Sequence, residues 1–499
     1  MSSTLPFGYV YDERMLEHDC PYDKTMAENP QRMMLIHERL KKDGLLDKAI
    51  KIPARPATDD ELLLNHPDEL LRELETLKTA EECEQYCKDK EILWLGPKSE
   101  MAARLAAGSA IDMVRANVEK QIGNGFAIIR PPGHHAHGKL PQGYCVFNNV
   151  AVAAKVAVEK FGVKKVAIVD HDYHPANGTF HSLKDDDRFL LISLHGYHHA
   201  AFWPYTQDMD YDTPGKQIFF PLNQTMNTEG DYMATFRHVI MPVLKEYDPE
   251  LIFVSAGFDS GYYDIMLTAG QAVKAHGFGH MVRELNAFRP NKVLSFLEGG
   301  YFSTNYVESA AMSVRGLREM PLPNMEHPKR VSPGLVETIW NNVIHHSRQF
   351  KCMEQKLAEL QVQQEDSGLP HYKLPPKLHL GIGVREIWEK VKQMKAVRTR
   401  EWFPELDPKL TALCNEKIAE YVKNYDWSEP KKPMSDKEAL SQLIWDEQTK
   451  AECFLGVGKS CYEFAQQNQD FLDGKVDHLM ICDTILMREA EEKMKKQPE

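Results

Sequence analysis

The sequence predicts an α/β protein with an open, mainly parallel β-sheet, helices on both faces of the sheet and a helical C-terminal extension. Five apolar runs lack alternation, which is typical of parallel strands covered on both faces. They occupy residues 125–135, 164–174, 188–197, 250–261 and 292–301. Each run ends in polar or glycine-rich sequence. Because open α/β sheets bind ligands at the carboxyl ends of their strands, these ends predict the functional site.

Helical patterns separate the apolar runs, as the alternation of an α/β fold requires. The strongest two cover residues 101–120 and 149–161, and a further helix over 334–360 is expected to pack on the sheet domain. We therefore assign residues 1–360 to one domain.

The C-terminal part of the chain has a different composition. Residues 361–382 are rich in proline and glycine and predict a linker. Residues 383–499 are charged and helical, with a capping box from Ser435 to Glu438, and their role is unknown. This helical region is a candidate site for a protein partner.

Composition excludes several classes of protein. The 499 residues are 42% hydrophobic, enough for a large core, and the net charge of −13 argues against a direct nucleic-acid binder. Nine cysteines without paired spacing suggest reduced thiols. We find neither a signal-peptide pattern nor an apolar run of membrane-spanning length. The expectation is a soluble protein of the cytoplasm, the nucleus or both, with no membrane partner.

A metal site is one interpretation of "VDHDYHPANG" (169–178). Asp172 and His174 flank Tyr173 just past a strand, where side chains two residues apart can point to one side. Asp259, in "SAGFDSG", can supply a third ligand from another strand end. Carboxylate and imidazole suit zinc, and three protein ligands leave a position open for catalysis. Taken without Asp259, the pair is equally consistent with a polar turn.

The loop "RPPGHHAHG" (130–138) carries adjacent histidines, His134 and His135. Two neighbouring imidazoles are awkward in a core, but they suit proton transfer beside a metal-bound water. Each needs a partner on its other ring nitrogen, and Asp170 and Asn177 are candidates.

Aromatic residues also stand near the predicted strand ends. Tyr301, in "LEGGY", can donate a hydrogen bond to a developing oxyanion, although a packing role is the simpler explanation of this motif alone. Tyr144 and Trp203 are candidates for the wall of a channel, although aromatic residues more often simply pack. The pairs His198–His199 and His345–His346 are expected at the surface.

Taken together, "RPPGHHA", "VDxDxH", "NGT", "ISLHGY", "AGFD" and "LEGGY" resemble the motifs of the zinc-dependent histone deacetylases in order and approximate spacing. The opening "GYVYDERMLEHDC" and "TIWNNVIHHSRQF" are most similar to class II enzymes of the IIb branch. The resemblance covers roughly residues 6 to 355 and implies an arginase-like fold with zinc at the carboxyl edge of the sheet.

The resemblance also implies roles for the candidate residues. Zinc would be held by Asp172, His174 and Asp259. His135 would be the general base and acid, with His134 as its electrostatic partner, and Tyr301 would polarise the acetyl carbonyl. Asp170 would stand behind His134, and Asn177 behind His135. Potassium would be bound by oxygens of Asp170, Asp172, His174, Ser193 and Leu194, and the channel would include Gly143, Tyr144, Trp203 and Met266.

Three departures from the family pattern stand out. His171 replaces the usual Trp, and Pro175–Ala176 replaces His-Gly. Proline lacks a backbone donor and alanine resists positive φ, so we expect a differently shaped loop. The segment after Asp259 is longer than usual and has Met266 near the position where polyamine-selective relatives carry glutamate.

Three functions compete. The first is removal of acetyl groups from lysine in histones or cytoskeletal and other proteins, and the second is the same chemistry on an acetylpolyamine. The third is a catalytically weakened scaffold that binds acetyl-lysine. The complete set of ligands, histidines and tyrosine favours the first.

Overall fold

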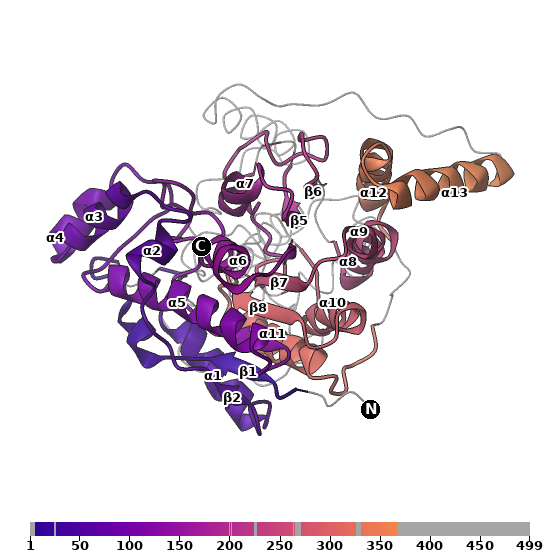
Figure 1. Ribbon diagram of the computed structural model, residues 1–499. Helices are drawn as coiled ribbons and strands as arrows, with labels where there is room; N and C mark the ends of the chain where they lie inside the picture. The colour runs from indigo at the N-terminus through magenta and orange to yellow at the C-terminus, as the bar shows by residue number, and fades with distance from the viewer. Residues whose placement is uncertain are drawn as a thin grey trace, which may run out of the picture.

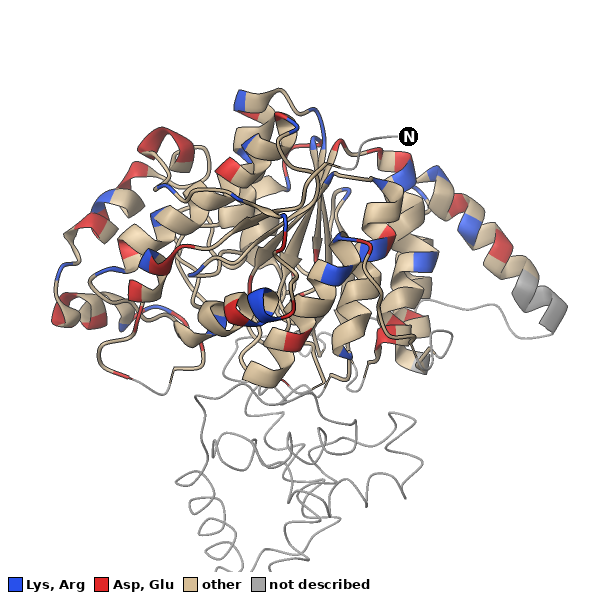
Figure 2. Ribbon diagram, turned by 90° about the horizontal axis from the view of Figure 1, so that it is seen from below, with Lys and Arg blue, Asp and Glu red and all other residues tan. Residues whose placement is uncertain are grey.

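The computed structural model describes residues 5–23, 26–198, 200, 202–223, 227–262, 264, 271–325 and 331–367. In this part of the chain, an eight-stranded sheet forms the centre of the molecule and helices lie on both of its sides (Figures 1 and 2). The predicted α/β class with an open parallel sheet is therefore confirmed.

All neighbouring strands of the sheet pair in parallel, in the order β2-β1-β3-β8-β7-β4-β5-β6. The strands are β1 (Gly8–Val10), β2 (Ile50–Lys51), β3 (Gly125–Ala127), β4 (Val166–Asp170), β5 (Phe189–Gly196), β6 (Ile218–Leu222), β7 (Leu251–Ala256) and β8 (Val293–Leu297). Strands β3, β4, β5, β7 and β8 lie inside the five predicted apolar runs. Strands β1, β2 and β6 were not predicted.

Charged residues are nearly absent from these strands. Among the strand residues only Lys51 and Asp170 carry a charge, and the other Lys, Arg, Asp and Glu residues that the structure describes lie on surrounding helices and loops (Figure 2). Strands β3 to β8 are buried throughout. Burial on both faces explains why their sequences are uniformly apolar.

The helices cover the sheet in groups. They are α1 (Gln31–Lys42), α2 (Asp59–Leu62), α3 (Asp68–Thr76), α4 (Ala80–Cys87), α5 (Ser99–Val118), α6 (Asn149–Phe161), α7 (Asn177–Leu183), α8 (Glu229–Thr235), α9 (Met241–Tyr247), α10 (Ala275–Phe288), α11 (Ser303–Leu317), α12 (Pro333–His346) and α13 (Lys351–Ser367). A 3₁₀ turn spans Glu13–Glu17, and a π-helical turn, Phe236–Ile240, joins α8 to α9. Helices α5 and α6 pack together, as do α10 and α11, with α1 against α11.

The single helix predicted over 334–360 is wrong, because two helices occupy this segment. Helix α12 ends at His346, and the backbone turns before α13 begins at Lys351. The Glu246 carboxylate accepts hydrogen bonds from the backbone N–H groups of Lys351 (3.0 Å) and Cys352 (2.8 Å). These bonds satisfy two donors of the first turn of α13 and so fix the start of a new helix.

Helix α13 projects from the sheet domain (Figure 1) and continues to Ser367, past the linker boundary expected at residue 361. The segment before Gly368 contains neither proline nor glycine, so nothing in it ends the helix. The rest of the predicted linker and the region 383–499 lie outside the described residues. Within the described part of the chain, no helix is both long and apolar enough to cross a membrane.

Sheet order determines where the predicted motifs meet. Strands β3, β8, β7 and β4 are consecutive neighbours in the sheet although they are far apart in the sequence. Because all four are parallel, their carboxyl ends share one edge. The histidine loop after β3, "EGGY" after β8, "GFD" after β7 and "DHDYH" at the end of β4 therefore converge.

Candidate active site

Three buried side chains, Asp172, His174 and Asp259, form a cluster at this edge. One potential ligand atom from each residue lies within 4.8 Å of the others. Nδ1 of His174 lies 2.7 Å from Asp259 Oδ2 and 3.3 Å from Asp172 Oδ1. The fold thus brings together the three residues expected to bind zinc.

The donor set fits a divalent cation. Asp172 is 0% exposed and Asp259 is 3% exposed. Their partners among the described residues are each other, histidines and backbone N–H groups, without a Lys or Arg. Burial and then the neighbouring Asp172 carboxylate raise the pKa of Asp259 to about 7. Two buried carboxylates at such close range are costly unless a cation compensates them. Oxygen and nitrogen donors of this kind suit zinc.

Two glycines make room for the Asp172 carboxylate. A methyl group at Gly257 would lie 1.9 Å from Asp172 Oδ2, and one at Gly299 would lie 2.5 Å from the same atom. The backbone N–H of Gly299 donates to this oxygen at 2.8 Å. The Asp172 carboxylate therefore packs directly on the backbone that follows β7 and β8.

The two histidines of the loop after β3 have different partners. Nδ1 of His134 lies 3.1 Å from Asp170 Oδ2, and Nδ1 of His135 lies 2.7 Å from Asn177 Oδ1. An amide oxygen only accepts hydrogen bonds, so Nδ1 of His135 carries a proton and Nε2 is left as an acceptor. The centroids of the His134 and His135 rings are 3.9 Å apart.

Neighbouring charges give these two rings very different pKa values. Burial lowers the pKa of His134, but the Asp172 and Asp170 carboxylates outweigh it and raise that pKa to about 10. Burial and then the charge of His134 hold the pKa of His135 well below its ordinary value. His134 is thus the cationic ring of the pair, and His135 is the neutral one.

The Tyr301 hydroxyl lies near the cluster of Asp172, His174 and Asp259. A methyl group at Gly299 would lie 3.2 Å from this hydroxyl and 3.2 Å from Asp259 Oδ2, so both atoms border the same small space. Burial and then the Asp172 charge hold the pKa of Tyr301 well above its ordinary value. The phenol therefore keeps its proton and can donate a hydrogen bond.

Two residues that the sequence analysis missed hold Tyr301 in place. The Asp264 carboxylate accepts from the backbone N–H groups of Tyr301 (2.7 Å) and Phe302 (3.2 Å). The Arg32 guanidinium lies 5.0 Å from the Tyr301 ring centroid and donates to the Gly300 carbonyl at 2.6 Å. Asp264 was hidden in the atypical segment after Asp259, and Arg32 lies far away in the sequence.

Arg32 belongs to a buried charge network that was also missed. Glu28 accepts from Arg32 at 3.0 Å and from both Nε and Nη2 of Arg130, and Arg130 donates to the His18 carbonyl at 2.9 Å. Glu28 and Arg130 are both 0% exposed. A charged Arg130 at the end of an apolar run is a signal that could have indicated this network.

Three of the four predicted channel residues can be placed. The Trp203 ring meets the His135 ring edge-on at 4.6 Å, and the Tyr144 and Tyr301 ring centroids are 5.8 Å apart. A methyl group at Gly143 would lie 2.4 Å from Trp203 and 2.5 Å from His135. These residues lie against the rings of His135 and Tyr301, whereas Met266 lies outside the described residues.

The loop at Pro175–Ala176 keeps the cluster intact. Ala176 has an ordinary φ of −74°, and the Pro175 carbonyl accepts from the Asn177 N–H at 2.8 Å. The expected steric conflict at Ala176 therefore does not arise. His171, in place of the usual Trp, is buried and its Nδ1 lies 2.9 Å from the Gly257 carbonyl oxygen.

The residues expected to bind potassium lie on adjacent strands. Asp170 at the end of β4 pairs in register with Ser193 of β5, and Leu194 is the next residue of β5. This placement agrees with a shared site, and potassium binding stays a prediction.

The surface assignment of the remaining histidine pairs is partly wrong. His346 is 0% exposed because α12 packs against β6 and buries its inner face, and His345 is half-buried. His198 is half-buried with its Nε2 3.1 Å from the Tyr173 hydroxyl, and His199 lies outside the described residues.

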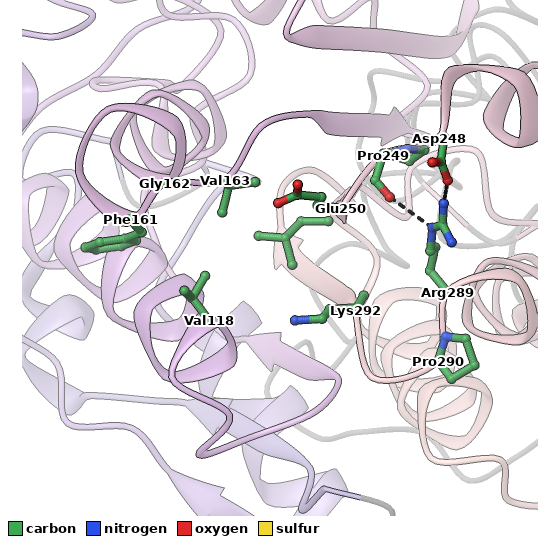
Figure 3. Close-up of a pocket in the computed structure, with 11 residues that line it drawn as sticks. Val118, Phe161, Gly162, Val163, Asp248, Pro249, Glu250, Arg289, Pro290 and Lys292 are labelled. Atoms are coloured by element: carbon green, nitrogen blue, oxygen red, sulfur yellow. Dashed lines mark hydrogen bonds and ion pairs between the residues drawn. The ribbon is translucent and has the colours of Figure 1, made fainter. Parts of the chain in front are cut away.

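A pocket of about 570 Å³ lies at the opposite edge of the sheet (Figure 3). Glu250 and Lys292, whose segments lead into β7 and β8, contribute charges of opposite sign, and Arg289 is paired with Asp248. The catalytic candidates follow the same strands at their other ends. This pocket is therefore separate from the candidate active site.

Known proteins are similar to this chain in both sequence and fold. The histone deacetylase domain model matches residues 26–317. Human polyamine deacetylase HDAC10 is 33% identical over 381 residues, which are 74% of this chain and 56% of the relative. Histone deacetylase clr3 of Schizosaccharomyces pombe is 35% identical over 368 residues, 70% of this chain and 53% of the relative.

The structural comparison agrees. The crystal structure of the HDA15 HD domain superposes with a TM-score of 0.65 at 29% identity, covering 72% of this chain and 99% of that domain. The chain spans about half the length of the curated relatives it matches. The matched domain includes the Asp172, His174 and Asp259 cluster, the paired histidines and Tyr301. The chain therefore belongs to the histone deacetylase family and is class IIb-like.

Proposed function

We infer that the chain is a zinc-dependent hydrolase that removes acetyl groups from N-acetyl-lysine of histones or other proteins. The observation that carries this proposal is the convergence of Asp172, His174 and Asp259 with His135 and Tyr301 at one edge of the sheet. Such a group combines metal ligands, a proton acceptor and a hydrogen-bond donor for an oxyanion, which amide hydrolysis needs.

Asp172, His174 and Asp259 would hold the zinc ion. Bound zinc supplies Lewis acidity, which lowers the pKa of a bound water to roughly 7 and polarises the acetyl carbonyl. Gly257 and Gly299 allow the backbone to approach Asp172 closely, so its position is set before any metal binds.

His135 is the proton carrier in this proposal. Its Nδ1–H is directed to Asn177, so Nε2 accepts a proton from the attacking water and later gives it to the departing lysine nitrogen. His134, held by Asp170, provides positive charge beside the reaction.

Tyr301 donates a hydrogen bond to the carbonyl oxygen as negative charge develops on it. Water oxygen forms a bond to the acetyl carbon, the carbon–nitrogen bond breaks and the nitrogen receives the proton from His135. Acetate and a free lysine amine are the products, so no redox partner is required.

Activity assays of purified variants test this function. Asp172→Ala should lose stoichiometric zinc, and it should lower kcat/KM on an acetyl-lysine peptide by roughly 1,000-fold. Tyr301→Phe should keep zinc and lower kcat by roughly 100- to 1,000-fold. A chelator should abolish the wild-type activity and added zinc should restore it. Unchanged turnover in both variants would refute the assignment.

An acetylpolyamine is the second candidate substrate. It is favoured by the 33% identity to a protein named polyamine deacetylase, whereas Met266 instead of glutamate favours acetyl-lysine. We expect a higher kcat/KM for an acetyl-lysine peptide than for N-acetylspermidine, measured under the same conditions. A higher value for the polyamine would transfer the proposal to that substrate class.

A weakened scaffold is the third candidate, and its mark would be a purified chain without stoichiometric zinc. The proposal has three further parts. Potassium would bind at Asp170, Ser193 and Leu194, and the protein would reside in the cytoplasm or the nucleus. Residues 383–499 would bind a protein partner.

A further inference from the structure

The loop that carries the paired histidines is anchored by its backbone as well as by its rings. Three consecutive N–H groups donate to two side chains. Glu298 Oε2 accepts from Gly133 at 2.7 Å and from His134 at 3.2 Å, and Cys145 Sγ accepts from His135 at 3.4 Å. These three backbone donors thus have acceptors outside the turn.

Glu298 is itself rigidly held. It follows β8 directly and is 0% exposed. The Arg32 guanidinium donates to the carbonyl oxygens of Glu298 (2.5 Å) and Gly300 (2.6 Å), while Glu28 accepts from the same guanidinium at 3.0 Å. Because the backbone on both sides of Gly299 is fixed, the Glu298 carboxyl group has little freedom to move away from the loop.

The burial of this carboxyl group is costly for folding. Oε1 of Glu298 has no hydrogen-bond partner among the described residues. Burial raises the pKa of Glu298 to about 7, although the charge of His134 opposes this effect. An unpaired buried acceptor is unfavourable for folding, so the unpaired Oε1 of Glu298 lowers stability. A costly polar residue beside an active site is the kind of feature that function preserves.

The two histidines are therefore held by residues from different parts of the fold. Asp170 of β4 and Asn177 of α7 fix the rings, and Glu298 at the end of β8 fixes the backbone. The same β8 end carries Tyr301. Glu298 thereby links the position of the proton carrier to that of the oxyanion donor.

We propose that Glu298 is a positioning residue for His134 and His135, acting through the N–H groups of Gly133 and His134. This role deepens the proposed deacetylase function and rests on it. Glu298 contacts backbone groups and no reacting atom, so its loss should displace the histidines while the zinc ligands stay in place.

Two substitutions separate the hydrogen-bond role from the charge. Glu298→Gln keeps an oxygen acceptor, whereas Glu298→Leu keeps similar bulk without one. Because small displacements of a catalytic group can cost about 100-fold, Glu298→Leu should lower kcat roughly 10- to 100-fold with KM and zinc content within twofold of wild type. Glu298→Gln should restore kcat to within threefold of wild type.

A matched control lies at the other end of β8. Asn124 is buried, and its Oδ1 accepts from the backbone N–H of Val293 at 3.1 Å. Asn124→Leu also removes a buried acceptor of a backbone donor, but far from the histidines. It should lower the melting temperature without the selective loss of kcat.

Hydrogen–deuterium exchange gives a readout that does not depend on activity. A peptide covering residues 131–137 should exchange about tenfold faster in Glu298→Leu than in wild type, and at the wild-type rate in Glu298→Gln. If the wild type has no deacetylase activity, the proposed function fails while this exchange result still tests the anchor. Unchanged exchange and unchanged kcat in Glu298→Leu, or equal impairment of both variants, would overturn the proposal.

Discussion

Gly257 makes the metal cluster sensitive to a single methyl group. Alanine at this position would place its Cβ 1.9 Å from Asp172 Oδ2, and the buried surroundings leave the carboxylate no alternative position. We expect Gly257→Ala to weaken zinc binding by roughly 10- to 100-fold, the range found when support of a ligand is lost. Zinc affinity measured by competition with a chromogenic chelator checks this. Wild-type affinity in a folded variant would show that the ligand does not need this contact.

Pro175–Ala176 is expected to be nearly neutral for catalysis despite its departure from the family pattern. Ala176 has a negative φ, which any residue can adopt. The turn is closed by the backbone carbonyl of residue 175, and this group is present whichever residue stands there. Restoring His-Gly at these positions should therefore change kcat/KM on an acetyl-lysine peptide by less than threefold. A larger gain would mean that the proline does perturb His174.

The residues with chemically distinctive side chains were predictable from sequence, and their supports were not. Asp172, His174 and His135 stand in polar motifs directly after apolar runs, so their spacing indicates their placement. Glu298 and Asp264 act by accepting backbone N–H groups 165 and 37 residues away, respectively. No local pattern encodes such a contact, because it depends on which strands become neighbours.

At the scale of the element, strand length and position decided what could be predicted. Strands β4, β5, β7 and β8 are interior or long, and their continuous apolar sequence is distinctive. Strands β1 and β2 have three and two residues, too few for a period. Strand β3 is as short as β1, but the apolar sequence continues past it to Ile129 and made it recognisable. Strand β6 contains Pro221, which normally argues against a central strand, and it is tolerated here because β6 is an edge strand.

The break between α12 and α13 gives a testable element of stability. Glu246→Ala would free the N–H groups of Lys351 and Cys352, which lose their acceptor at the start of α13. Loss of a helix cap costs about 1 kcal/mol, so faster amide exchange over residues 351–360 is expected. Deacetylase activity should not change, because α13 lies outside the site. Unchanged exchange would mean that packing alone fixes the helix.

At the scale of the whole molecule, buried neutral histidines predict acid instability. His66 Nε2 accepts the backbone N–H of Asn148 at 2.9 Å, and its Nδ1 lies 2.9 Å from the Gly138 carbonyl oxygen. Burial lowers the pKa of His66 to about 4, and also those of His18 and His195. A histidine in the unfolded chain has a pKa of about 6.5. The unfolded state therefore binds more protons between these two values.

The free energy of unfolding should consequently be constant for these groups above pH 6.5 and fall as the pH drops toward 4. Each histidine contributes a slope of about 1.4 kcal/mol per pH unit in this window. Urea unfolding at pH 7.5, 6.0 and 5.0 measures the effect, and His66→Gln should reduce the slope. An identical slope in the variant would mean that His66 does not remain neutral in the folded protein.

The order of strands in the sheet also governs how the protein can be built. Strands β7 and β8 insert between β3 and β4, which precede them in the chain. A nascent chain that ends after β6 can form only two separate groups of strands, and the facing edges of β3 and β4 remain unpaired. Such edges readily pair with other chains. Arrival of the last two strands closes this gap. Asp259 follows β7, so the cluster of Asp172, His174 and Asp259 can assemble only after β7 has joined the sheet, and Tyr301 reaches the same edge with β8.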